Sequence, residues 1–505
     1  MKPGVGDVLS PQEIRDRAAG GAALLVARGT LILVLGVGAN IVLARLLAPR
    51  DFGIVALGTV LLSVGTFLSD GGLGAGLIRR PEPPLARELE AVNAAQIAIT
   101  LAITTVCFAV GAVLGGDALV VAAMVATLPI TILKVPSIIL LDRDLTYRPI
   151  ATADLLEALS FYVVTIVTVA LGMGVWGFVV GMAVRAVTGT ATIAALGPVG
   201  LVRPRWSWRH LRPLLRFGAK FQAVVVTSMV REQGLNVGLA LVAGVATLGV
   251  WNLAWRVLQV PFMVFGTLGR IGYPTMARLL GAGQDPKPVI ERGVAALAIV
   301  TGAMMVAVTG FAPALPVLLG HGWGEVPTVL LWAGIAMTCS LPIYLASFGY
   351  LFATDAGATV LKTAIAGAVA WLAVALALVS SIGPEAAGIG WCVSAAVQLT
   401  LLIPRIEARS GAAVGASLAV PTVTAVAAAA GGWLLARASG GSLSGGAAGL
   451  AVGELALFAV LALLDRRALR DTRLIVGDAW GSLLSRIAPA RGGVEPRVPA
   501  SSNAP

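Results

Sequence analysis

The stretch "GLNVGLA" at residues 234–240 repeats the pattern of "GANIVLA" at residues 38–44, 196 positions earlier. Both read Gly-x-Asn-(Ile/Val)-x-Leu-Ala, and the alignment continues without a gap until Gly53 falls on Gly249. Internal similarity at a fixed offset indicates that the same structural unit occurs twice. We therefore predict two halves of similar architecture.

A second pair of similar stretches supports this prediction. "GFVVGMA" at residues 177–183 resembles "GWCVSAA" at residues 390–396. Each pair places one member in the first half of the chain and the other in the second half, so both pairs indicate the same division.

The composition predicts where the two halves reside. Hydrophobic residues make up 58% of the 505 positions and charged residues 12%. Apolar runs of roughly 20 residues, the length that crosses a bilayer, recur from end to end. We predict an all-α integral membrane protein with about fourteen transmembrane helices. The predicted spans are 22–46, 53–77, 91–114, 118–141, 150–171, 175–196, 217–242, 247–269, 293–312, 327–352, 363–381, 386–403, 413–436 and 447–464.

The Lys and Arg residues predict the orientation of these spans. Most of the 36 basic residues fall in segments that share one side of the membrane with both termini, which predicts that both termini are cytoplasmic. Basic loops at an anionic leaflet account for the net charge of +11, so no nucleic-acid partner is implied.

The repeat and the spans together define the predicted organisation. Six spans separate the repeat copies, so the halves share one orientation and are related by an axis along the membrane normal. The predicted parts are a cytoplasmic N-terminus (1–21), an N-lobe of spans one to six with an amphipathic linker (22–213), a C-lobe of spans seven to twelve (214–410), spans thirteen and fourteen (411–465) and a basic cytoplasmic tail (466–505).

Two amphipathic segments are predicted to lie at the inner membrane surface. "RPRWSWRHLRPLLRFG" at residues 203–218 alternates arginines with tryptophans and leucines, as a surface helix between the lobes would. A second surface helix is expected after Arg473.

The loops and the reactive residues exclude most catalytic functions. The chain has no phosphate-binding Gly-x-x-x-x-Gly-Lys-(Ser/Thr) loop and thus no ATPase site of that kind. Cys107, Cys339 and Cys392 lie singly inside predicted spans, and His210 and His321 lie in loops. We predict a protein that is not an enzyme, with no cofactor and no metal site.

Polar residues inside the spans mark the candidate functional site. Asn252, Trp255, Arg256 and Gln259 share one face of span eight, and Asp70 ends a polar stripe on span two. A charge at the bilayer centre costs about 2.5–3.5 kcal/mol, so such residues are expected to face water, a partner or a ligand. Trp255 could instead serve only to pack against a neighbouring helix.

Spans one and seven add further charges to the predicted cavity. Span seven carries Arg231, Glu232 and Asn236, and span one carries Arg28. Two readings remain open: Arg231 and Glu232 could bind a ligand or only pair with a neighbour. For Arg28, a structural pair with Asp70 is the alternative to a ligand role.

We expect structural roles for the other charged residues inside the predicted spans. Asp154 and Glu157 lie one turn apart at the start of span five, where Asp154 is expected to be a solvated helix start. Lys134, Arg185 and Glu454 stand singly, and we expect each to pack or to extend toward the interface.

Three further stretches resemble those of a known family. "LARLLAPRDFGIVALGTVLLSVGTFLSDGGLGAGLIRR" at residues 43–80 is similar to the first two spans of bacterial polysaccharide or lipopolysaccharide biosynthesis flippases of the multidrug/oligosaccharidyl-lipid/polysaccharide exporter superfamily. "LGVWNLAWRVLQVPFMVFG" at residues 248–266 and "YPTMARL" at residues 273–279 resemble the same family in the second half.

This resemblance implies an alternating-access transporter in the bacterial cytoplasmic membrane. The implied cargo is an undecaprenyl-pyrophosphate-linked oligosaccharide for lipopolysaccharide, exopolysaccharide or capsule synthesis, and a polymerase and glycosyltransferases are implied partners. Related lipid II flippases use cavity arginines for the pyrophosphate, which implies this role for Arg28, Arg231 and Arg256. The family often carries Asp in mid-span seven, whereas this chain has Glu232 nearby.

The residue chemistry is consistent with that cargo. Guanidinium groups hold phosphates through paired hydrogen bonds. Trp255 offers an apolar face for a sugar ring, with Asn252 and Gln259 for its hydroxyls. Asp70 and Glu232 are the acids placed to couple transport to a proton or sodium ion.

Two other functions remain open. A drug or metabolite cation antiporter of the same superfamily would have a similar architecture but a net acidic cavity. A membrane-embedded glycosyltransferase or polymerase would need a large external loop, and the predicted external loops are all short.

Overall fold

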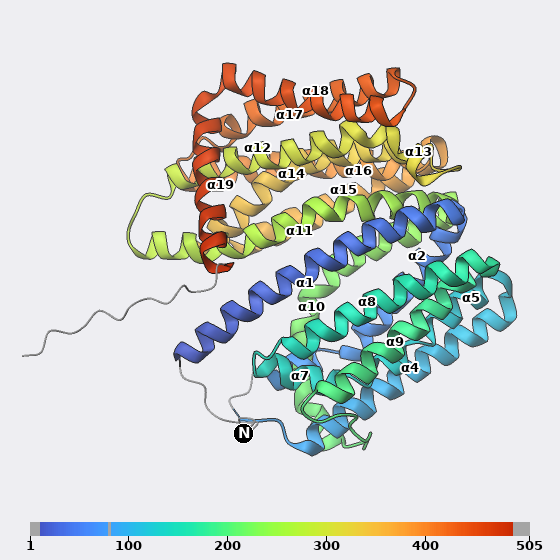
Figure 1. Cartoon of the computed structure of the whole chain (residues 1–505). Helices are drawn as coiled ribbons and strands as arrows, with labels where there is room; N and C mark the ends of the chain where they lie inside the picture. The colour runs from blue at the N-terminus through green and yellow to red at the C-terminus, as the bar shows by residue number, and fades with distance from the viewer. Residues whose placement is uncertain (1–10, 79–81, 488–505) are drawn as a thin grey trace, which may run out of the picture.

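The computed structural model describes residues 11–78 and 82–487, and within these ranges every regular element is helical and no strand occurs (Figure 1). Eleven helices are long and apolar enough to cross a membrane, or twelve if one bent pair counts as a single span. The prediction of an all-α, multi-span membrane protein is therefore confirmed.

The first half of the chain forms the N-lobe, with short helices between its spans. Its elements are α1 (Pro11–Leu46), α2 (Pro49–Asp70), α3 (Leu73–Ile78), α4 (Ala86–Leu114), α5 (Gly116–Val125), α6 (Leu128–Ile132), α7 (Val135–Arg143), α8 (Arg148–Thr168), a π-helical turn (Val169–Met173) and α9 (Trp176–Leu196).

The second half forms the C-lobe and the C-terminal helices. Its elements are α10 (Trp208–Ala243), α11 (Val245–Gly281), α12 (Lys287–Phe311), a 3-10 turn (Ala312–Ala314), α13 (Leu315–Leu319), α14 (Val326–Ala353), α15 (Gly357–Ile382), α16 (Glu385–Ser410), α17 (Val414–Ala438), α18 (Leu443–Leu464) and α19 (Arg466–Ile487). All fourteen predicted spans coincide with helices. Twelve of them are the membrane-spanning helices counted above, with the bent pair as one span, and the other two are α10 and α11.

The fourth predicted span is not one straight helix. The chain from Gly116 to Ile132 and the helix from Val135 to Arg143 meet at an angle of 51°. Pro136 stands in the first turn of α7. Proline has no N–H for the preceding turn and its ring crowds that turn, which favours a kink or a break in the helix at this point.

The amphipathic linker also differs from its prediction. Residues from Trp208 onward do not form a separate surface helix; they are the first turns of α10, which continues unbroken into span seven. Leu211 and Leu214 are buried in an apolar cluster with Leu73, Leu77 and other residues of the N-lobe. The change from an amphipathic to an apolar pattern therefore does not end the helix here. The second amphipathic segment does form a helix, α19.

The two halves meet in a reciprocal contact between α2 and α11. A β-carbon added to Gly53 would lie 1.8 Å from the carbonyl oxygen of Val245, and one added to Gly249 would lie 1.8 Å from the carbonyl oxygen of Pro49. Pro49 and Val245 are themselves 196 residues apart, so each half makes the same contact on the other. A two-fold relation produces contacts of this kind, and the predicted repeat is thereby confirmed.

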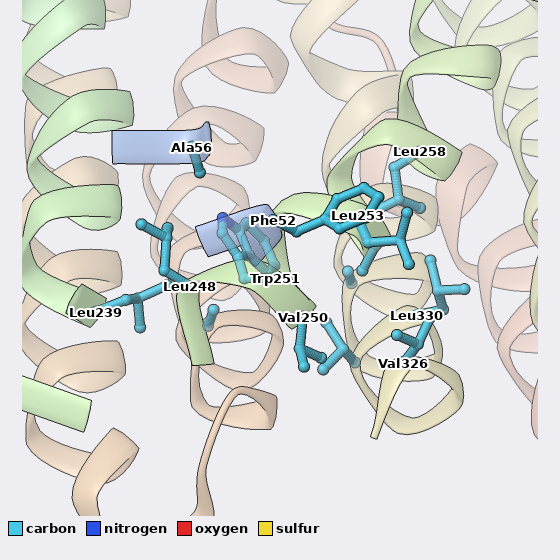
Figure 2. Close-up of a cluster of buried hydrophobic side chains, with 14 of the residues drawn as sticks. Phe52, Ala56, Leu239, Leu248, Val250, Trp251, Leu253, Leu258, Val326 and Leu330 are labelled. Carbon is cyan, nitrogen blue, oxygen red and sulfur yellow. The ribbon is translucent and has the colours of Figure 1, made fainter. Parts of the chain in front are cut away.

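Apolar side chains fill the space around this crossing. Figure 2 shows Phe52 of α2 beside Trp251 and Leu253 of α11, all of them buried. Leu43 and Leu239, the equivalent leucines of the repeat, are both fully buried in the same cluster. The contact between the halves thus centres on the crossing of α2 and α11, nine residues beyond each copy of the repeated motif.

Polar contacts join the lobes at the same end. The Arg45 guanidinium donates to the carbonyls of Val317 and Leu318 at 3.2 and 2.6 Å. The Trp323 indole N–H donates to the Ala44 carbonyl at 2.9 Å. The end of α1 is therefore fastened to the segment around α13, beside the glycine crossing.

Candidate functional site

The N-lobe contains a polar cavity of about 260 Å³ between α1, α8 and α9. Arg28 of α1, Asp154 and Glu157 of α8 and Arg185 of α9 contribute its charged lining. Tyr162 adds a phenol to the wall. The cavity therefore collects charged groups from three spans inside one lobe.

Ion pairs connect these groups. Arg28 pairs with Asp154, and Glu157 pairs with Lys134, which stands at the bend before α7. The Arg185 Nε lies 3.4 Å from the second carboxylate oxygen of Glu157. Three basic side chains thus face two carboxylates, which leaves one positive charge without an acid.

The two ends of the cluster differ in burial. Glu157 and Lys134 are 7% and 12% exposed, whereas the Arg185 side chain is 53% exposed. A β-carbon added to Gly189 would lie 1.7 Å from a Glu157 carboxylate oxygen, so the glycine makes room for the acid. Glu157 and Lys134 therefore form a buried ion pair at the bottom of the cluster. Arg185 lies over this pair, and some of its guanidinium N–H groups have no acceptor among the described residues.

Several sequence expectations are wrong at this cavity. Asp154 is not a solvated helix start, Lys134 and Arg185 do not stand singly, and Arg28 does not pair with Asp70. The sequence separations explain the errors, because Arg28 and Asp154 are 126 positions apart. The spacing of Asp154 and Glu157 one turn apart was the available signal, but their partners depend on the tertiary arrangement.

Arg256 occupies a second polar position, where α11 meets α1. Its guanidinium donates to the Asn40 side-chain oxygen at 2.7 Å and to the Asn252 side-chain oxygen at 3.3 Å, and it lies over the Phe52 ring at 5.9 Å. Among the described residues, Arg256 forms no ion pair. Its charge is held by two neutral amides, and Glu232 pairs with Arg231 rather than with Arg256.

Trp255 belongs to an aromatic cluster of the C-lobe. Its ring centroid lies 6.0 Å from that of Trp251, 5.7 Å from Trp391 and 5.4 Å from Phe262. The ring is only partly buried. The packing alternative for Trp255 thus has direct structural support.

The remaining predicted residues lie apart from one another. Arg231 and Glu232 are neighbours in α10 and their side chains approach to 3.4 Å, as the pairing alternative described. Asp70 accepts hydrogen bonds from the Gly72 backbone at 3.1 Å and from the Gln222 amide at 3.4 Å. Gln259 is exposed.

The predicted residues therefore do not all line one cavity. Arg28 and Asn40 lie on the same helix but are separated by about 18 Å along its axis, given the rise of an α-helix. Arg28 belongs to the N-lobe cavity, and Arg256 belongs to the contact between the lobes.

Comparison with known proteins identifies the family. Residues 42–327 match the family model described as polysaccharide biosynthesis protein. The chain belongs to this family. The match includes all three stretches on which the resemblance in sequence rests, and that resemblance is confirmed.

Two curated proteins are similar to this chain in sequence, and their names refer to the biosynthesis of lipopolysaccharide and of succinoglycan. The chain is 26% identical over 343 residues to the lipopolysaccharide biosynthesis protein WzxC of Escherichia coli, covering 63% of this chain and 66% of WzxC. It is 25% identical over 358 residues to the succinoglycan biosynthesis transport protein ExoT of Rhizobium meliloti, covering 67% of this chain and 71% of ExoT.

The fold is similar to a solved transporter structure. The lipid II flippase MurJ in an inward closed conformation superposes with a TM-score of 0.66 at 11% identity, over 88% of this chain and 99% of MurJ. This similarity shows that the present chain has the same multi-span fold as MurJ.

Proposed function

We propose that this protein is an alternating-access flippase that moves polyprenyl-pyrophosphate-linked oligosaccharide across the cytoplasmic membrane of a bacterium. The oligosaccharide would serve lipopolysaccharide, exopolysaccharide or capsule synthesis. Membership of the family and the names of WzxC and ExoT support the class of cargo. The similarity to MurJ supports the class of machine.

The observation that carries the proposal is the uncompensated positive charge of the N-lobe cavity. A charge inside a membrane protein is costly and marks a functional site by default. Arg185 has one long ion-pair contact, to Glu157, and lies over the Phe161 ring at 5.9 Å, and the Arg28 Nε is buried without a partner among the described residues. Free guanidinium N–H groups bind phosphate oxygens in pairs, so an anionic headgroup fits this cavity better than a cationic drug.

The other predicted residues take supporting roles in this proposal. Arg231 and Arg256 would contact the cargo as it passes between the lobes, with Asn252, Trp255 and Gln259 against its sugars. Glu232 and Asp70 would couple transport to a proton or sodium ion. Asp70 suits this role because its described partners are neutral donors, so its charge is not already balanced.

Arg185→Ala is the first test of the cargo site. We expect the affinity for undecaprenyl pyrophosphate to fall about tenfold to a hundredfold, because a hydrogen bond to a charged group contributes about 1.5–3 kcal/mol. Arg185→Lys should recover part of the loss. Native mass spectrometry of the purified protein measures the bound lipid.

Arg50 offers the matched control for this measurement. It is also an exposed arginine with one carboxylate partner, Asp117 at 2.8 Å, but it does not line the cavity. Arg50→Ala should bind like the wild type. Equal affinities for Arg185→Ala and Arg50→Ala would remove the cavity from the proposal.

Arg256→Ala separates a cargo role from a structural role. Because its partners are neutral amides, truncation leaves no buried acid unpaired, and the loss of stability should stay below the roughly 3–5 kcal/mol of a broken buried ion pair. Export of polymer should nevertheless fall at least about tenfold, with partial recovery in Arg256→Lys. Thermal unfolding and polymer export are measured on the same variants.

A structural role for Arg256 predicts the reverse. Normal export by a strongly destabilised Arg256→Ala would show that Arg256 only joins α11 to α1 through Asn40.

The proposed orientation places both termini in the cytoplasm. In a chain whose three cysteines are replaced by alanine, a cysteine at Ser442, between α17 and α18, should react with an impermeant maleimide in intact cells. A cysteine at Ser501 should react only after the membrane is opened. Labelling at Ser501 in intact cells would reverse the assignment.

A further inference from the structure

A second cavity, of about 280 Å³, lies where the linker after α9 meets α2 and α4. Leu68 of α2, Ala95 and Ala98 of α4, Trp206 of the linker and Trp208 at the start of α10 contribute to its lining, which is almost entirely apolar. Ala98 is exposed, so the cavity opens at the surface of the lobe. Its contents must therefore come from outside the N-lobe core.

The cavity lies on the opposite side of α2 from Asp70, the proposed ion-coupling residue. Thr66 and Asp70 mark the polar stripe of α2, and Leu68 stands two residues from each. At 3.6 residues per turn, Leu68 points about 160° away from both. The cavity is thus on the outer, lipid-facing side of α2, which favours a lipid of the surrounding bilayer over the transported molecule.

The linker is fixed in place beside the cavity. The Asn93 side-chain amide donates to the Val202 carbonyl at 2.6 Å, and the Arg205 backbone N–H donates to the Glu90 carbonyl at 3.2 Å. These contacts hold Trp206 and Trp208 over the cavity although both side chains are more than half exposed. The wall is therefore part of the fold.

The surroundings of the cavity carry positive charge. Arg203, Arg205, Arg209 and Arg212 flank the two tryptophans in the chain, and all four are exposed. Among the described residues, none of them forms an ion pair. Tryptophans beside arginines are typical of segments at the membrane interface, where the rings lie among headgroups and the charges meet phosphates.

We propose that this cavity binds an anionic phospholipid from the leaflet on the linker side. One acyl chain would enter between Ala98 and the tryptophans, and the phosphate would contact Arg205 and Arg209. The apolar lining suits the chain, and the unpaired arginines suit the headgroup. A bound lipid would fasten the start of α10 to the N-lobe through Leu211, which also lines the cavity.

Native mass spectrometry of the delipidated full-length protein tests this site. The probes are dioleoylphosphatidylglycerol and dioleoylphosphatidylcholine, which share their acyl chains and differ in charge. We expect the glycerol lipid to bind more tightly, and Arg205→Gln and Arg209→Gln each to weaken it roughly fivefold. Ala98→Trp should fill the cavity and abolish binding of the first lipid equivalent.

Ala109→Trp is the matched control, because Ala109 is exposed on the same face of α4 two turns beyond the cavity lining. It should bind like the wild type, and unfolding curves should confirm that both tryptophan variants are folded. Equal binding by Ala98→Trp and Ala109→Trp would overturn the site. Equal affinity for the two probes would overturn the headgroup contact, and displacement of the glycerol lipid by equimolar undecaprenyl phosphate would overturn the assignment to a bilayer lipid.

Discussion

Gly249→Ala is expected to lower the free energy of unfolding by about 3 kcal/mol and to abolish transport. The added methyl group would lie 1.8 Å from the Pro49 carbonyl oxygen and 2.9 Å from the Gly53 backbone nitrogen. Both obstacles are backbone atoms, which cannot rotate away as a side chain does, so the cost is at the upper end for over-packed interiors. Unfolding by denaturing detergent in mixed micelles measures it.

The two-fold relation makes this prediction specific. Gly53→Ala should have nearly the same effect, because its methyl group would lie 1.8 Å from the Val245 carbonyl oxygen. Gly38→Ala is the control: Gly38 belongs to the repeated motif, but nothing lies within 4 Å of its added methyl group. Alanine is favoured over glycine within a helix by about 1 kcal/mol, so this variant should be as stable as the wild type or more so. Unchanged stability in both crowded variants would contradict the close crossing of α2 and α11.

Lys134→Met is expected to be the second most damaging substitution. It leaves Glu157, 7% exposed, with only the longer contact to Arg185. Removing one partner of a buried ion pair costs about 3–5 kcal/mol, and the remaining arginine places the expected loss near 3 kcal/mol. The same detergent unfolding experiment applies.

The double variant Lys134→Met with Glu157→Gln should recover most of this stability, because the neutral amide no longer needs a cation. Lys362→Met is the control, since Lys362 is exposed on α15 and has no described ion pair. A Lys134→Met protein as stable as the Lys362→Met protein would show that Glu157 is not held as a buried anion.

Much of the fold could be predicted from the sequence, because a bilayer requires long apolar helices and the repeat relates the two halves. The repeat also paired Gly53 with Gly249, the two glycines at which α2 and α11 cross. The bend at Pro136 was less accessible: proline indicates that a helix breaks but not by what angle. The unbroken course of α10 was missed because an amphipathic pattern can continue as an apolar one without any interruption of backbone hydrogen bonds.

The candidate site was harder to predict than the fold. Polar positions within a span could be found from periodicity, as Arg256 and Asn252 were. Their partners could not, because Asn40 is 216 positions from Arg256 and the approach of α1 to α11 depends on how both lobes pack. The N-lobe cavity could not be predicted for the same reason, because its charged residues come from α1, α8, α9 and the bend before α7.

Flipping in proteoliposomes tests the central claim most directly. Purified protein is reconstituted with a polyprenyl-pyrophosphate-linked oligosaccharide, under a membrane potential or a proton or sodium gradient, and the sugar that reaches the outer leaflet is detected by an impermeant glycosidase. We predict protein-dependent exposure of the internal oligosaccharide, slowed at least about tenfold by Arg185→Ala and unchanged by Arg50→Ala. Exposure no faster than in protein-free liposomes under every gradient would contradict the proposal that this protein flips a lipid-linked oligosaccharide.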